Sequence, residues 1–196
     1  MNFKDYINDE GYDDYKKLAL IAIEEYGESL NYIPKWIFED KEFLLEAINV
    51  NLEAVMDFNC IPDSFFEDKE FVHKAIQMNI DFVDYMPDKL RNDKKFMIEL
   101  IKNDGFCLEY ASDELRDDKD VVLEAIKKNG LTLAYASDRL KSDKDVVLEA
   151  VKNDKYAIGY AKKECKIDRD IMNITFDAMK AAYENLRKKD DDNLEL

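Results

Sequence analysis

DKDVVLEAIKKNGLTLAYAS, residues 118–137, returns 25 residues later as DKDVVLEAVKNDKYAIGYAK, residues 143–162. The Asp-Lys pair that opens both stretches, or an Asp-Arg variant of it, recurs along the chain at residues 40, 68, 93, 118, 143 and 168. The first interval is 28 residues and the others are 25, because three extra residues lie around Phe58-Asn59-Cys60. A fixed period of this length indicates a tandem repeat array.

The sequence predicts that each copy begins with a helix. Asp118 stands where an N-cap residue belongs, since its carboxylate can accept hydrogen bonds from the first free backbone N–H groups. Alanine recurs at one position of this helix, which favours close helix–helix approach. We expect the helix to end at Asn129-Gly130, with the glycine in the left-handed conformation. The apolar positions Val121, Val122, Ala125 and Ile126 share one face.

A second, shorter helix is expected after the first, followed by a break and a one-turn linker. Proline or serine marks the break, as at Pro87, and Leu90 is predicted to anchor the next turn in the core. No copy can bury its apolar face alone. The sequence therefore predicts an all-α fold, a right-handed α-solenoid of about seven 25-residue helix–short-helix repeats.

The repeat boundaries define the expected domain organisation. We predict one α-helical repeat domain over residues 1–187, and terminal copies that are polar on the outside. It comprises an N-terminal cap (1–14), six repeats (15–167) and a C-terminal capping repeat (168–187). Residues 188–196 are expected to form a frayed tail.

Composition narrows the classes of partner. The net charge is −16, so direct binding to nucleic acid or to an anionic membrane is not expected. No apolar run reaches 18 residues, and the acidic start does not resemble a signal peptide. Cys60, Cys107 and Cys165 form no close pair, which favours free thiols and a cytoplasmic location.

The negative charge is concentrated in the first half of the chain. Residues 1–85 hold 20 Asp and Glu against 7 Lys and Arg, a balance of −13, and the remaining residues carry −3. One interpretation is a solvated surface that maintains solubility. The other is a docking face for a partner with a basic surface.

The consensus over residues 115–137, L-x-D-D-K-D-V-V-L-E-A-I-K-K-N-G-L-x-L-x-Y-A-S, resembles a known repeat family. Its members are short tandem helical repeats that are classified only as a domain of unknown function. The resemblance implies a helical repeat array. It implies no reaction, no cofactor and no catalytic residue.

The residues themselves also predict no catalytic, cofactor or metal site. His73 occupies a position that is apolar in the other copies, so a half-buried helix residue is expected. None of the cysteines has a neighbouring histidine that would activate a nucleophile. The Asp-Lys pairs are interpreted as an N-cap with a solvent-facing lysine. The recurrent tyrosines indicate either the rim of the core or a binding groove; they are Tyr32, Tyr85, Tyr110, Tyr135 and Tyr160.

Trp36 departs from the repeat, because its position is polar in the other copies. It is either a partly exposed interface anchor or a residue packed under the three-residue insertion. Together with nearby acids it gives the candidate partner-binding set. These residues are Trp36, Glu24, Glu25, Glu28, Glu39, Asp40, Glu42, Asp57, Asp63 and Glu67.

Two functional hypotheses follow. The first is a non-enzymatic protein-binding module whose acidic half docks on a basic surface of a partner, possibly a nuclease or another nucleic-acid-binding enzyme. Its most specific form is an inhibitor or immunity-type protein, of the toxin-immunity or anti-CRISPR kind. The second is a structural or scaffolding repeat protein without an inhibitory role. The sequence does not predict the oligomeric state.

Overall fold

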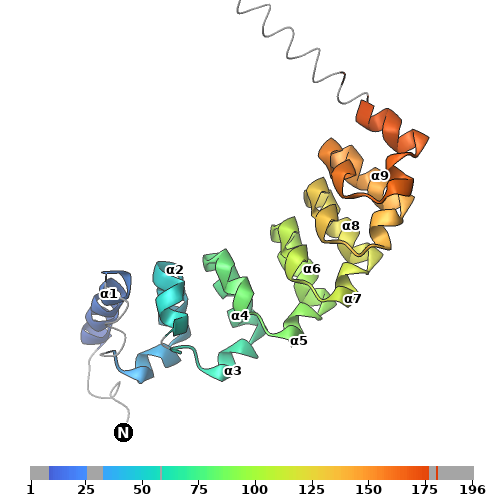
Figure 1. Cartoon of the computed structure of the whole chain (residues 1–196). Helices are drawn as coiled ribbons and strands as arrows, with labels where there is room; N and C mark the ends of the chain where they lie inside the picture. The colour runs from blue at the N-terminus through green and yellow to red at the C-terminus, as the bar shows by residue number, and fades with distance from the viewer. Residues whose placement is uncertain (1–8, 26–32, 58, 177–179, 181–196) are drawn as a thin grey trace, which may run out of the picture. The chain divides into compact units, whose positions relative to one another are not determined.

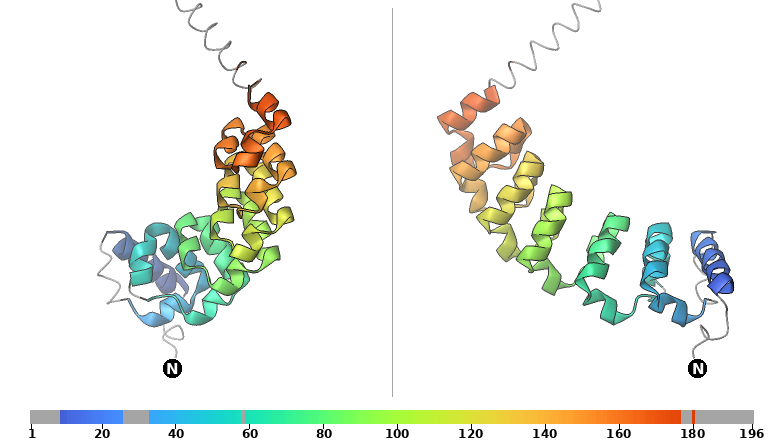
Figure 2. Two further views of the ribbon diagram at one scale, coloured as in Figure 1. Left: turned by 45° about the vertical axis from the view of Figure 1, so that its right-hand side comes forward. Right: turned by 180° about the vertical axis from the view of Figure 1, so that it is seen from behind.

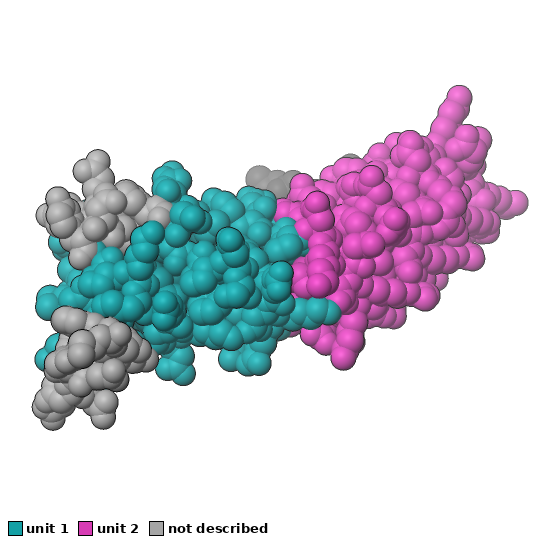
Figure 3. Space-filling model, turned by 90° about the horizontal axis from the view of Figure 1, so that it is seen from below, with its two compact units in different colours: residues 1–87 teal, residues 88–196 magenta. Residues whose placement is uncertain are grey.

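Figure 1 shows a computed structural model of the chain, which describes residues 9–25, 33–57, 59–176 and 180. These residues form α-helices, 3-10 helices and connecting turns, and no strand occurs among them, so the all-α repeat fold is confirmed. The chain divides into two compact units, Met1–Pro87 and Asp88–Leu196 (Figure 3). The single domain over residues 1–187 and the right-handed solenoid stay predictions.

Unit 1 is built on three long helices that lie side by side. Helix α1 packs against α2, and α2 packs against α4 (Figures 1 and 2). Helix α1 begins inside the segment that the sequence predicted as a separate cap, residues 1–14. The elements of unit 1 are α1 (Asp9–Glu25), η3 (Lys35–Glu39), α2 (Lys41–Asp57), α3 (Asp63–Phe66), α4 (Lys69–Met78) and η4 (Ile80–Tyr85).

Unit 2 repeats the same plan with shorter, more regular copies. Its central helix α8 packs against α6 on one side and α9 on the other. Residues 169–176 are also helical. The elements of unit 2 are α5 (Asp88–Arg91), α6 (Lys94–Asn103), η5 (Gly105–Tyr110), α7 (Asp113–Arg116), α8 (Lys119–Lys128), η6 (Gly130–Tyr135), η7 (Leu140–Ser142), α9 (Lys144–Asn153), η8 (Lys155–Tyr160) and α10 (Lys163–Lys166).

Each copy in unit 2 is a long α-helix, a 3-10 helix and a one-turn linker. The predicted N-cap is confirmed, because Asp118 accepts hydrogen bonds from the backbone N–H groups of Asp120 and Val121. The predicted core face is also confirmed: Val121, Val122, Ala125 and Ile126 are fully buried. The predicted second helix is the 3-10 helix, which packs back on its own α-helix.

The long helix does not end with a left-handed glycine at Asn129-Gly130, so this prediction is wrong. Asn129 adopts an extended conformation (φ −154°, ψ 121°), and its side chain accepts a hydrogen bond from the N–H of Leu131 at 2.9 Å. The residue therefore caps the following 3-10 helix. An Asn or Asp at the same register position caps the 3-10 helix in other copies, namely Asn79, Asp104 and Asp154.

Glycine follows Asn129 for a packing reason. No glycine in the described part of the chain has a positive φ, so the predicted left-handed cap is absent there. A Cβ on Gly130 would lie 2.8 Å from the backbone nitrogen of Asp154, and closer still to the carbonyl oxygen of Ala150. Gly130 thus lets one copy approach the backbone of the next. Gly27 lies outside the described residues.

The linker turns form as predicted. Helix α5 follows Pro87, and Leu90, Leu115 and Leu140 are buried beneath their turns. At the corresponding positions of unit 1, Ile37 is buried and Phe65 is half-buried. In unit 2 consecutive linkers are also joined through the backbone, because the N–H of Ser137 donates to the carbonyl of Arg116 at 2.9 Å.

The Asp-Lys pairs connect neighbouring copies, which corrects the interpretation of the lysine as merely solvent-facing. Lys119 Nζ lies 2.8 Å from Oδ2 of Asp143, the N-cap aspartate of the next copy. The pKa of Asp143 is lowered: burial alone would raise it, and the hydrogen bonds from Lys119 and the helix backbone outweigh burial. Equivalent contacts join Lys16 to Asp40, Lys41 to Asp68, Lys94 to Asp118 and Lys144 to Asp168.

The three-residue insertion changes the second helix of its copy. Helix α2 continues past a break at Asn51 (φ −155°, ψ 85°) to Asp57, in place of a 3-10 helix. Asn59 then takes the left-handed conformation (φ 50°), and the N–H of Cys60 donates to the carbonyl of Val55. Phe58 lies outside the described residues.

Substitutions at Asp143 and Lys119 separate capping from the contact between copies. Asp143→Ala removes both, and we expect the free energy of unfolding to fall by about 1–2 kcal/mol. Asp143→Asn keeps one side-chain acceptor, so its free energy of unfolding should fall by less. Lys119→Met keeps the cap and removes only the ion pair, so it should have the smallest loss, because exposed ion pairs contribute little. Urea denaturation followed by circular dichroism measures all three. Equal losses for Lys119→Met and Asp143→Ala would contradict this order.

Gly130→Ala tests the close approach of the two copies. We expect a loss of about 1–3 kcal/mol in the free energy of unfolding, because the added methyl group meets backbone atoms that cannot move aside. Gly159→Ala is the matched control, since a Cβ there meets nothing within 4 Å. The same urea experiment checks both variants. An unchanged midpoint for Gly130→Ala would show that the neighbouring copy yields easily.

Candidate binding surfaces

The acidic candidate residues lie on the elements of unit 1. Glu24 and Glu25 end α1, Glu39 ends η3, and Glu42 lies in the first turn of α2. Among the candidates, most are exposed and form no ion pair in the described part of the chain; these are Glu24, Glu25, Glu39, Glu42, Asp57, Asp63 and Glu67. Glu28 lies outside the described residues.

These residues do not form one continuous patch. Tyr12 and Lys16, near the start of α1, contact Asp40, whereas Asn51 donates to the carbonyl of Ile23 near the end of α1. Helices α1 and α2 therefore run in the same direction. At 1.5 Å per residue, Glu24 lies about 12 Å along the helix from Lys16. The acids at the η3–α2 junction and those at the end of α1 are two separate groups.

Asp40 serves the fold, although the sequence placed it in the docking set. Its Oδ1 accepts from the N–H groups of Glu42 and Phe43, and its Oδ2 from the Tyr12 hydroxyl at 2.8 Å. Lys16 Nζ lies 2.7 Å from the same Oδ2. Burial would raise the pKa of Asp40, but these hydrogen bonds lower it to about 2. The carboxylate is therefore already satisfied within unit 1.

Trp36 contacts α1. Its ring stacks on Tyr12 and Tyr15, with ring centroids 5.8 and 5.9 Å apart. The side chain is half-buried, as a partly exposed residue was expected to be. Neither sequence interpretation foresaw this arrangement, since both left out α1. Trp36 therefore helps to hold η3 against α1.

The remaining chemically interesting side chains occupy structural positions. Cys107 and Cys165 are buried, Cys60 is half-buried, and burial raises the pKa of the Cys60 and Cys107 thiols to about 11. These thiols are protonated at neutral pH and are poor nucleophiles. His73 is half-buried on α4. No group of His, Cys, Asp and Glu in the described residues is arranged to hold a metal ion.

The recurrent tyrosines lie at the rim of the core. Tyr110 and Tyr135 are half-buried, whereas Tyr85 and Tyr160 are 42% and 46% exposed. Burial and a hydrogen bond to Glu109 raise the pKa of Tyr135. These positions fit the core-rim interpretation, and Tyr32 lies outside the described residues. No helix in the described part of the chain has the length and apolar character needed to cross a membrane.

Comparisons with known proteins identify the repeat and nothing more. No curated protein and no solved structure matches the chain. A family model described as a domain of unknown function (DUF4116) matches residues 15–66, 68–116 and 118–166. Each match spans two of the six repeats predicted over residues 15–167, and the matches together cover most of the chain. The chain therefore belongs to this family of tandem helical repeats, the domain of unknown function DUF4116.

Proposed function

We propose that this chain is a non-enzymatic protein-binding module whose acidic unit 1 docks on a basic surface of a partner protein. The observation that carries the proposal is the set of exposed carboxylates in unit 1 that form no ion pair with another described residue. Glu39 and Glu42 lie at the η3–α2 junction in this set, and Glu24 and Glu25 form a second group at the end of α1. Uncompensated surface charge of one sign favours association with a surface of the opposite sign.

The contrast with unit 2 supports this proposal. Acids of unit 2 are commonly paired with lysine or arginine, as Glu124 is with Lys127 at 2.6 Å and Asp138 with Lys162 at 2.7 Å. Residues 1–85 carry −13 and the rest of the chain −3, so the first half of the chain carries most of the net charge. A general need for solubility does not require such a concentration in one unit.

The most specific form of the proposal is an inhibitor or immunity-type protein that acts on a nucleic-acid-processing enzyme. Basic protein surfaces are commonly nucleic-acid-binding channels, since affinity for phosphates depends on Lys and Arg. An acidic repeat protein that docks on such a channel excludes the nucleic acid. This form is of the toxin-immunity or anti-CRISPR kind, and the negative charge of unit 1 supports it.

Charge reversal in two separate variants tests the docking surface. Glu39→Lys/Glu42→Lys alters the η3–α2 junction, and Glu24→Lys/Glu25→Lys alters the end of α1. We expect at least one variant to slow association with the partner by about tenfold or more, because long-range attraction raises the association rate. Affinity purification with cross-linking from cells that express the protein identifies the partner, and surface plasmon resonance then measures the rate.

The matched control places the same charge change on unit 2. Glu99 and Glu164 are exposed and have no ion pair in the described residues, so Glu99→Lys/Glu164→Lys should leave association unchanged. The wild-type association rate should also fall as salt rises, because surface charges are screened. If all three variants bind the partner equally, the acidic surface is not the docking face. A partner that binds no nucleic acid would refute the specific inhibitor form.

A scaffolding role is the second candidate. It is favoured by exposed apolar side chains near the two ends of the described chain. Leu18 and Ile21 on α1 are 66% and 50% exposed, and Met172 and Phe176 are 52% and 68% exposed. Exposed apolar residues that cluster on one helix face are typical of protein–protein contacts.

Self-association distinguishes scaffolding from docking on a partner. If the protein assembles through these ends, its mass in size-exclusion chromatography with light scattering should rise with concentration. Leu18→Glu/Ile21→Glu should then abolish the increase, because both side chains are exposed and their replacement leaves the core intact. A monomeric mass at all concentrations would rule out scaffolding by self-assembly and leave the docking proposal unaffected.

A further inference from the structure

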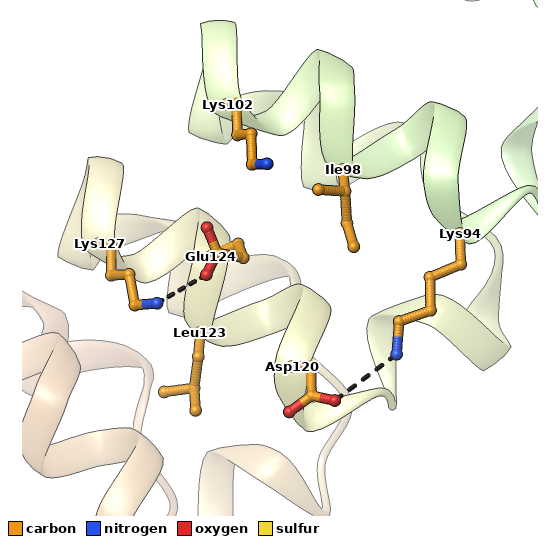
Figure 4. Close-up of a pocket in the computed structure, with 7 residues that line it drawn as sticks. All are labelled: Lys94, Ile98, Lys102, Asp120, Leu123, Glu124 and Lys127. Atoms are coloured by element: carbon orange, nitrogen blue, oxygen red, sulfur yellow. Dashed lines mark hydrogen bonds and ion pairs between the residues drawn. The ribbon is translucent and has the colours of Figure 1, made fainter.

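A shallow groove lies between helices α6 and α8 of unit 2 (Figure 4). Its volume is about 430 Å³, and it is open to solvent along one side. Ile98 and Lys102 of α6 point towards α8, and Glu124 of α8 points back towards α6. The residues that line it are Lys94, Ile98, Lys102, Asp120, Leu123, Glu124 and Lys127.

The floor of the groove is apolar and belongs to a repeated row. Ile98 and Leu123 are half-buried and hold the same register position in successive copies. Leu148 holds this position on α9, which packs against α8, and it is also half-buried. The row of half-buried apolar residues therefore continues from α6 across α8 to α9, beyond the groove itself. Neighbouring helices pack about 8–10 Å apart, so the row presents one apolar side chain at about that interval.

A row of lysines runs beside the apolar row. Lys102, Lys127 and Lys152 hold one register position near the ends of α6, α8 and α9, and all are exposed. The corresponding residues of unit 1 are Glu24, Asn49 and Gln77, so the basic row is a property of unit 2 alone.

The charge of this row is available to a ligand. Lys102 forms no ion pair in the described part of the chain, although its charge contributes to lowering the pKa of Glu124, after the larger effect of the hydrogen bond from Lys127. Within the described residues, Lys127 and Lys152 each pair with a glutamate on their own helix and with no other acid, at 2.6 and 3.7 Å. Both lysines are more than half exposed, and such surface pairs are weak enough to exchange for a ligand.

We propose that the groove and its lysine row bind an acidic peptide segment in the polyproline II conformation, with an apolar residue at every third position. Such a segment has three residues per turn and rises about 3.1 Å per residue, so every third side chain lies on one face about 9 Å apart. This interval matches the spacing of the apolar row. Acidic residues beside each apolar residue then meet the lysines.

The acids in the groove argue against a nucleic acid as the occupant. Asp120 and Glu124 line the groove, and Glu149 holds the position of Glu124 in the next copy. A nucleic-acid strand has a phosphate on every nucleotide, and it would bring this negative charge against the carboxylates of the groove. A peptide of the proposed kind can carry one carboxylate in three residues, so it brings less negative charge against these carboxylates. The proposal is independent of the docking of unit 1, since it concerns the other unit and a ligand of opposite charge.

The test uses the full chain and the synthetic peptide (Leu-Glu-Pro)4, labelled for fluorescence anisotropy. We expect saturable binding that Lys102→Glu/Lys127→Glu/Lys152→Glu weakens by about tenfold or more. The peptide (Ser-Glu-Pro)4 keeps the charges and loses the apolar contacts, so it should bind at least about tenfold more weakly than (Leu-Glu-Pro)4. Circular dichroism confirms that the triple variant stays folded, as expected for three exposed side chains.

Lys89→Glu/Lys95→Glu/Lys163→Glu is the matched control, because it makes the same charge change at exposed lysines of unit 2 outside the row. It should leave peptide affinity within about twofold of wild type. No saturable binding of (Leu-Glu-Pro)4 up to about 1 mM would overturn the proposal, as would equal weakening by both triple variants. Tighter binding of an oligothymidylate than of the peptide, or a lysine-row-dependent dimer in light scattering, would assign the groove to a different occupant and overturn it as well.

Discussion

Helices α2, α4, α8 and α9 each begin at one carboxylate whose two oxygens have different partners. In Asp118, Oδ1 accepts from the N–H groups of Asp120 and Val121, and Oδ2 accepts from Lys94 of the preceding copy. Asp143 repeats this arrangement with Lys119. Serine, threonine or asparagine can cap a helix, but each offers a single side-chain oxygen. The double use explains why aspartate is the residue that recurs, and it couples the start of a helix to the packing of the copy before it.

The regular part of the fold could be predicted from the sequence because it depends on local pattern. The N-cap aspartate and the apolar face of α8 follow from residue type and helical spacing. The Asn129-Gly130 pair was misread because a left-handed cap and a close backbone approach both favour glycine. Only the position of Ala150 in the next copy shows which of these two explanations applies to Gly130. The Asn or Asp that caps each 3-10 helix recurs at a fixed register position, and comparing that position across the copies would have found it.

The candidate surfaces were less predictable because they depend on which charges the fold neutralises. The count of residues locates the acidity in the first half of the chain. It does not distinguish Asp40, which Lys16 and Tyr12 contact, from Glu39, which forms no ion pair with any residue that the structure describes. Trp36 was compared only with residues at its own register position. Tyr12 and Tyr15, which it contacts, come from a different element, so a comparison of residues at one register position does not reveal the contact.

The repeat separates positions that the fold fixes from positions that remain free to vary. The N-cap aspartate, the lysine after it and the buried alanine hold neighbouring copies together, so a change there costs stability before it alters binding. The position of Lys102 carries no such constraint, and across the described copies it changes from Glu24 through uncharged residues to lysine. A repeat array gains specificity for a partner at such positions, because they face solvent at a regular interval on a rigid frame. Glu39 and Lys102 are therefore stronger binding candidates than Asp40, although all three are charged and near a helix end.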